Sequence, residues 1–95
     1  MIYEWDPKKA KANLRKHRVS FEEAATVFLD PLAVTYPDPD HSGEEMREIT
    51  VGYSSKGGVL FLSHTQREDR IRIIGARKAT LRERKQHEES ISKEK

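Results

Sequence analysis

Arginine and histidine side chains that could act on phosphate gather near the end of the chain. Arg72 lies in an apolar run and Arg77 follows it, within the segment IRIIGARKATLRERKQHEE. Arg84 and His87 lie three residues apart in the helix-like stretch that comes next. Arginine offers planar donors that match phosphate oxygens, and histidine titrates where a general acid or base is useful. Metal-free RNA cleavage needs both, because a proton must move and the crowded phosphorane must be stabilised by cations.

The helix-like stretch also has structural interpretations. Thr80 and Glu83 fit a capping box, which explains Glu83 without catalysis. Arg84 suits an ion pair with an acidic neighbour on a solvated helix. His87 is as consistent with an exposed residue without a role as with a proton donor. Arg72 and Arg77 are harder to explain structurally, because arginines that end an apolar strand in a small domain usually serve a ligand or an ion pair.

Two further histidines are candidates for proton transfer or RNA binding. His64 lies in an apolar strand on the face of Leu60 and Leu62. A packed, hydrogen-bonded imidazole is the first interpretation, and a base at the sheet edge is the second. His17 ends the first predicted helix beside Lys16, where a charged imidazole suits the helix dipole. Contact with RNA is the alternative role for this pair.

No metal or cofactor site is expected. The chain has no cysteine, which excludes disulfides, thiol nucleophiles and cysteine-based zinc sites. Asp38, Asp40 and His41 belong to ordinary turn chemistry without a supporting ligand spacing. No run is apolar enough to span a bilayer and the first residues have no signal-peptide pattern, so we expect a cytoplasmic protein without membrane contact.

The elements that must position these groups follow from hydrophobic periodicity and turn residues. Asp6 and Pro7 start the first helix, which runs to His17 with Ala10, Leu14 and His17 on one face. A second helix starts at a Ser20–Glu23 capping box and ends at Asp30–Pro31. A last helix covers about 80–89, and strands are predicted at 2–5, 32–36, 48–53, 59–65 and 70–76, the last of them central.

This order predicts one α+β domain over residues 1–95. We expect a mostly antiparallel sheet of about four to five strands, with the two N-terminal helices packed on one face. The C-terminal helix has no wide apolar stripe, which is typical of a helix that is solvated, mobile or completed by a partner. With 35% hydrophobic and 36% charged residues in 95, the core is modest.

Charge is distributed unevenly although the net charge is only +2. Residues 1–20 carry +4 and residues 64–87 carry +5, whereas residues 21–48 carry −7. If the fold brings the two basic blocks together, their field attracts polyanions.

Three segments give the chain a family resemblance. They are YEWDPKKAKANLRKHRVSFEEAATVFLD (3–30), REITVGYS (47–54) and RIIGARKATLRERKQHE (72–88), in this order along nearly the whole chain. The combination resembles the BrnT family of bacterial type II toxins, small ribonucleases with a RelE-like fold. The chain departs from the family pattern at His87, where many members have tyrosine, and at Gly75, where serine is common.

The resemblance implies a toxin that degrades RNA and arrests translation and growth. It implies neutralisation by a cognate BrnA antitoxin with a ribbon-helix-helix part, as a two-plus-two heterotetramer that contacts operator DNA only through the antitoxin. We expect the chain to be a metal-independent endoribonuclease. The expected catalytic residues are Arg72, Arg77, His87, His64 and Glu83, and the expected RNA-binding residues are Arg84, Arg67, Lys16, His17 and Arg47.

Two other functions remain compatible with the sequence. A small nucleic-acid-binding module or co-repressor subunit without catalysis would use the same basic strand and helix. A structural subunit whose last helix only docks a partner is the third interpretation.

Overall fold

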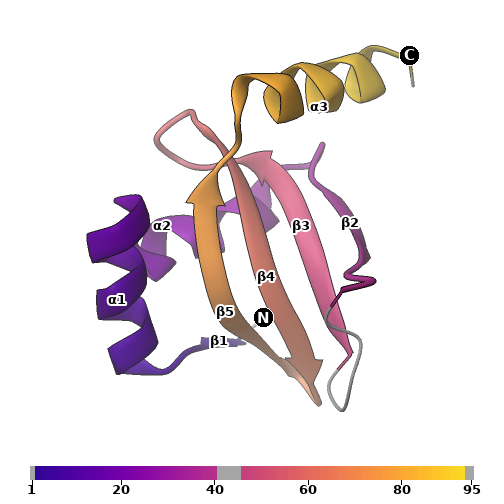
Figure 1. Cartoon of the computed structure of the whole chain (residues 1–95). Helices are drawn as coiled ribbons and strands as arrows, with labels where there is room; N and C mark the ends of the chain where they lie inside the picture. Colours follow the sequence, from indigo (N-terminus) through magenta and orange to yellow (C-terminus); the bar gives the residue numbers. More distant parts are fainter. Residues whose placement is uncertain (1, 41–45, 94–95) are drawn as a thin grey trace.

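A five-stranded sheet forms the centre of the molecule (Figure 1). The computed structural model describes residues 2–40 and 46–93, so His41 lies outside the described residues. The elements are β1 (Ile2–Glu4), α1 (Pro7–His17), α2 (Phe21–Ala25), the 3-10 helix η1 (Thr26–Leu29), β2 (Val34–Pro37), β3 (Arg47–Tyr53), β4 (Val59–Arg67), β5 (Arg70–Lys78) and α3 (Leu81–Lys93).

The strands lie in the order β1-β5-β4-β3-β2. β1 runs parallel to β5, and the other neighbours are antiparallel. This confirms the predicted α+β class and the mostly antiparallel sheet. It also shows that β4, not β5, is the middle strand. Within the described residues, β1 pairs with β5 along Arg70–Arg72, and no strand there pairs with the rest of the outer edge of β5.

α1, α2 and η1 cover one face of the sheet, as predicted. Buried residues from both layers form the core there: Val19, Phe21, Ala24, Val27, Leu60, Leu62, Ile73 and Ala76. We call the opposite face the open face. Alternation along β3 and β4 brings to it Arg47, Ile49, Val51, Tyr53, Phe61, Ser63 and Thr65. α3 lies across the open face only at the end of the sheet where β5 ends.

The predicted helix starts are confirmed. Asp6 caps α1 by accepting from the Lys8 amide at 2.9 Å. The Glu23 amide donates to the Ser20 hydroxyl at 3.0 Å, but the Glu23 carboxylate accepts from Ser54 in the β3–β4 hairpin at 2.7 Å. The second helix is shorter than predicted, because the chain tightens into η1 at the β-branched Thr26–Val27 pair.

The inward face of α1 differs from the predicted one. Ala10, Asn13 and His17 are half-buried toward the sheet, whereas Leu14 is 49% exposed. The reason is that Asn13 bonds to the edge of β5, and these bonds set the rotation of the helix. Figure 1 shows α1 alongside β5, where no neighbouring strand lies.

Candidate active site on the open face

A bulge in β5 decides which side chains reach the open face. Ser63 of β4 pairs with Gly75, but the next residue, His64, pairs with Ile73. Ile74 therefore has no residue opposite it, which is the pattern of a β-bulge. Each extra residue in a strand exchanges the two faces beyond it.

Arg72 and Arg77 face the same side of the sheet because of this bulge. They are five residues apart, and in a regular strand an odd separation would place them on opposite faces. With the bulge, Arg77 pairs with Phe61 and Arg72 pairs with Thr65, and both partners face the open side. The bulge was not predicted from the sequence.

Arg77 is held in one position by two neighbours. Its guanidinium donates to both carboxylate oxygens of Glu83, at 2.7 and 2.9 Å. Its Cζ also lies 4.6 Å from the centre of the Phe61 ring, a distance at which cation–π attraction contributes. Arg77 is thus fixed between β4 and the first turn of α3, with part of its surface still open to a ligand.

The Arg77–Glu83 pair decides how Glu83 is charged. The hydrogen bonds from Arg77 lower the pKa of the Glu83 carboxyl to about 2, and bonds from Thr80 add to this. The same carboxylate raises the pKa of Arg77. Glu83 also completes the predicted capping box with Thr80, with bonds of 2.9 and 3.1 Å. Glu83 is therefore an anion at neutral pH, and because its pKa is so low it is a weak base there.

Asn13 places the end of α1 against β5. Its amide nitrogen donates to the carbonyls of Val19 and Ala76 at 3.0 and 2.8 Å, and its oxygen accepts from the Ala76 amide at 3.1 Å. The side chain thus bonds to β5 as a neighbouring strand would. His17 follows one helical turn later and lies over the same edge.

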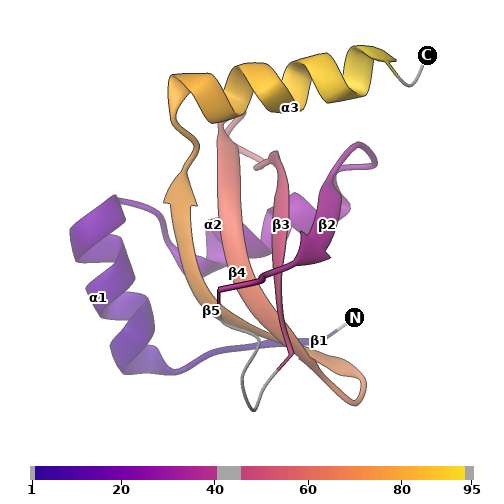
Figure 2. The same ribbon diagram turned by 45° about the vertical axis from the view of Figure 1, so that its right-hand side comes forward.

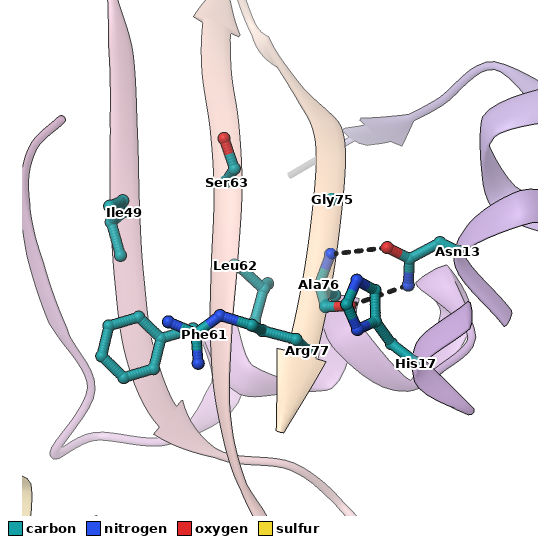
Figure 3. Close-up of a pocket in the computed structure, with 9 residues that line it drawn as sticks. All are labelled: Asn13, His17, Ile49, Phe61, Leu62, Ser63, Gly75, Ala76 and Arg77. Carbon is teal, nitrogen blue, oxygen red and sulfur yellow. Dashed lines mark hydrogen bonds between the residues drawn. The ribbon is translucent and has the colours of Figure 1, made fainter. Parts of the chain in front are cut away.

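A cavity of about 240 Å³ opens on this part of the sheet (Figure 3). It is lined by Asn13, His17, Ile49, Phe61, Leu62, Ser63, Gly75, Ala76 and Arg77. The cavity combines an apolar floor with a guanidinium and an imidazole from segments far apart in the chain. Here the fold joins the ends of the two basic blocks, as the charge pattern suggested.

Arg72 lies elsewhere, which corrects the predicted cluster of Arg72, Arg77, Arg84 and His87. Its guanidinium bonds to Glu4 of β1 at 2.9 Å. Four residues lie between it and Arg77, which places the two Cα atoms roughly 13 Å apart along the sheet. The two guanidinium groups bond to different carboxylates, those of Glu4 and Glu83, although both arginines face the open side.

His64 does not lie at the sheet edge, so the interpretation as an accessible base is wrong and the packed one is confirmed. The residue is 3% exposed on the helix-covered face, and its Nε2 lies 2.6 Å from the Thr50 hydroxyl. The Phe28 ring packs edge-on against it, with 5.0 Å between ring centres. Burial lowers the pKa of His64, with a smaller opposing effect from Glu48.

His87 is not the exposed bystander that the sequence allowed. It is 6% exposed beneath α3, with its ring centre 6.0 Å from that of Tyr53. It does not line the cavity that holds Arg77. Arg84 has the predicted surface pairing, with its Nε 3.8 Å from the Glu88 carboxylate.

The other cations expected to bind RNA are spread over the molecule. Arg47 begins β3 and lies in one row with Thr65 and Arg72 across the open face. Arg67 is exposed at the far end of β4, and Lys16 is exposed in the last turn of α1. The open face therefore carries cations at both ends.

Of the nine residues that line the cavity, only His17 and Arg77 were predicted as site residues from the sequence, and Asn13, Phe61 and Ser63 are among those missed. The spacing of Asn13 could have indicated its place, because a residue four positions before His17 lies on the same face of the helix. Phe61 and Ser63 alternate with Leu60 and Leu62, which shows that they face the other side, but not that a cavity forms there.

Within residues 2–40 and 46–93, no three His, Asp or Glu side chains gather closely enough to hold a metal ion. No helix in the same part of the chain has the length and apolar character needed to cross a membrane.

Known proteins match this architecture. The family described as "Ribonuclease toxin, BrnT, of type II toxin-antitoxin system" matches residues 5–83. The chain belongs to the BrnT family. The 1.1 Å crystal structure of the Brucella abortus ribonuclease toxin BrnT is similar in fold, with a TM-score of 0.66 and 17% identity over 84% of this chain and 99% of that one. No curated protein matches the sequence.

BrnT membership confirms the predicted class. The chain is a ribonuclease toxin of a type II toxin–antitoxin system, with RNA as substrate and an antitoxin as partner. Of the three functions compatible with the sequence, the family match confirms the enzyme, and not the binding module or the structural subunit. The matched range ends at Glu83, so the family match covers the cavity and the cap of α3 but not the rest of that helix.

Proposed function

We propose that the chain is a metal-independent endoribonuclease whose reaction takes place in the cavity between Arg77 and His17. The observation that carries this proposal is that these two residues line one cavity, although 59 residues of the chain lie between them. Cleavage needs a fixed cation at the phosphate and a group that moves a proton, and the cavity has both.

Arg77 would bind the scissile phosphate and stabilise the phosphorane. Its position between Glu83 and Phe61 means that little reorganisation is needed when charge develops. Because part of the guanidinium remains exposed, phosphate oxygens can bind it while Glu83 keeps its own bonds.

His17 would move the proton. As a neutral base it takes the proton of the 2′-hydroxyl, and the 2′-oxygen forms a bond to phosphorus. The bond from phosphorus to the 5′-oxygen breaks, and that oxygen receives the proton from the imidazolium. The products are a 2′,3′-cyclic phosphate and a 5′-hydroxyl.

The remaining predicted residues take other roles in this proposal. Glu83 positions Arg77, and His64 packs the core. Arg72, Arg47, Arg67, Lys16 and Arg84 would contribute cationic contacts to the RNA backbone, which position a strand without reading its sequence. Cleavage by this cytoplasmic toxin would arrest translation and growth.

The test compares two substitutions with a matched control. Arg77→Gln and His17→Gln should each lower the rate of RNA cleavage about 100-fold or more, and both should relieve growth arrest on induction. Lys11→Gln changes an exposed residue of α1 and should cleave as the unchanged protein does. Cleavage must persist in excess EDTA. Full activity of Arg77→Gln, or loss of activity in EDTA, would contradict the proposal.

We also propose the finer identity of the partner. It would be a BrnA-like antitoxin with a ribbon-helix-helix part, in a two-plus-two complex that contacts operator DNA only through the antitoxin. The support is membership of the BrnT family. The mass of the complex co-purified with the product of the neighbouring reading frame tests the stoichiometry, and a one-to-one complex would contradict it.

A further inference from the structure

A second hollow lies on the open face, on the other side of Phe61 from the proposed reaction site. It has a volume of about 190 Å³ and is formed between β2 and α3, with Val51 and Phe61 in its wall. Figure 2 shows α3 extending above the strand ends toward the β2 side of the sheet. The polar and charged residues that line it are Tyr36, Glu83, Gln86, His87 and Ser90.

The two hollows meet at the Arg77–Phe61 contact. Phe61 lines both of them. Glu83, which holds Arg77 at 2.7 and 2.9 Å, lines the second hollow. A phosphate bound to Arg77 would therefore lie at the boundary between the hollows, and a nucleotide attached to that phosphate can reach the second one.

The chemistry of the second hollow suits an unpaired nucleobase. Tyr36 is 39% exposed and offers an aromatic ring, and stacking on such rings is the usual way in which proteins hold single-stranded bases. Gln86 is exposed on α3 and carries both a donor and an acceptor, which can pair with a base edge.

Two further observations fit a polar ligand at this place. The buried Nε2 of His87 has no hydrogen-bond partner among the described residues, which is uncommon in a completed core. Burial and, to a smaller extent, the nearby Glu83 charge raise the pKa of Tyr36, so its hydroxyl stays a donor at neutral pH. A packed apolar seam between helix and sheet would need neither the ring nitrogen of His87 nor the side-chain amide of Gln86.

We propose that this hollow holds the unpaired base of a nucleotide adjacent to the scissile phosphate, with Tyr36 stacking on the base and Gln86 selecting it. The inference rests on the proposed function, because the phosphate on Arg77 places the base. It makes the substrate single-stranded RNA and gives the cleavage a base preference set by β2 and α3.

The test uses short single-stranded oligoribonucleotides that differ in one base beside the cleaved bond. Gln86→Ala should reduce the difference in kcat/KM between the preferred and the disfavoured base. Tyr36→Ala should lower kcat/KM about tenfold or more through loss of stacking, whereas Tyr36→Phe keeps the ring and should stay near the unchanged protein. Glu89→Gln, elsewhere on α3, is the matched control.

The outcomes separate this inference from the proposed function. If the unchanged protein cleaves in an Arg77-dependent way, but Gln86→Ala and Tyr36→Ala keep its kcat/KM and base preference, only the base site is overturned. Substitutions that weaken neutralisation by the antitoxin and leave cleavage unchanged would also overturn it, because the hollow would then serve a protein segment. If Arg77→Gln cleaves normally, the proposed function fails first. Should Tyr36→Ala not fold, the exposed Gln86 decides alone.

Discussion

At the scale of single residues, the decisive pair is Arg77 and Glu83. Glu83 lies beside the arginine proposed to bind phosphate, but its pKa of about 2 makes it a weak base near neutral pH. Its role is positional: the two bonds to Arg77 and the cap of α3 involve the same carboxylate. One side chain thus joins the phosphate-binding group to the helix that covers part of the open face.

Glu83→Gln should lower cleavage about tenfold by loosening Arg77, without removing an ionisation from the pH–rate profile; His17→Gln should remove one.

The stability of the Glu83→Gln protein gives a second measurement. The pKa of Glu83 is lower in the folded protein than its ordinary 4.5, so the stabilisation is complete above pH 4.5 and is lost as the pH falls toward 2. In urea unfolding at pH 7, we expect the free energy of unfolding of Glu83→Gln to be about 1 kcal/mol lower than that of the unchanged protein. The difference is small because solvent screens the Arg77–Glu83 pair. A difference that persists at pH 2 would contradict this.

At the scale of elements, α1 is docked by hydrogen bonds and not by an apolar stripe. Asn13→Ala removes three of them and leaves the Ala76 amide and carbonyl without these partners. We expect a loss of about 2–3 kcal/mol in the free energy of unfolding. Faster hydrogen exchange of the Ala76 amide and a large fall in cleavage should accompany it, because His17 loses its place. Unchanged exchange at Ala76 would contradict the docking role, and Lys11→Ala is the control on the same helix.

The strands β2, β3 and β4 are joined on the helix-covered face by a chain of polar groups, of which Thr50 and His64 are buried. The Thr35 and Thr50 hydroxyls lie 2.7 Å apart, and Thr50 contacts His64 at 2.6 Å. Burial lowers the pKa of His64 below its ordinary 6.5. The stabilisation that the buried, neutral imidazole contributes is therefore complete above pH 6.5, and it is lost as the pH falls through the lowered pKa. We expect urea midpoints to fall from pH 7 to pH 5, and His64→Gln to be less stable at pH 7 with a smaller fall. Equal slopes for both proteins would contradict this.

At the scale of the whole molecule, the open face carries arginines at both ends, a distribution that the net charge of +2 does not reveal. Arg47 and Arg72 lie in one row at one end, and Arg77 lies at the other. Arg47→Gln should reduce the slope of log affinity against log salt by about 0.7 for single-stranded RNA and leave kcat unchanged at saturating substrate. Lys56→Gln in the hairpin is the control. A fall in kcat with an unchanged salt slope would place Arg47 in the reaction itself.

The features of this molecule that could be read from the sequence are local ones. The caps at Asp6, Ser20 and Thr80 and the α+β order depend on neighbours within a few residues, and all are confirmed. The parallel pairing of β1, the bonds of Asn13 to Ala76 and the burial of His87 depend on contacts between distant segments. No periodicity encodes these contacts, so the cavity could not be assembled from the sequence.

The single unpaired position in β5 has a consequence for how this chain can change through evolution. Losing Ile74 would leave Arg72 and Arg77 four residues apart, and in a regular strand this even separation keeps both on the open face with their present partners on β4. An insertion or loss at any paired position between them would instead turn one of the two arginines to the helix-covered face. Related toxins that lack the extra residue could therefore present an arginine from the same place on the sheet with a regular strand.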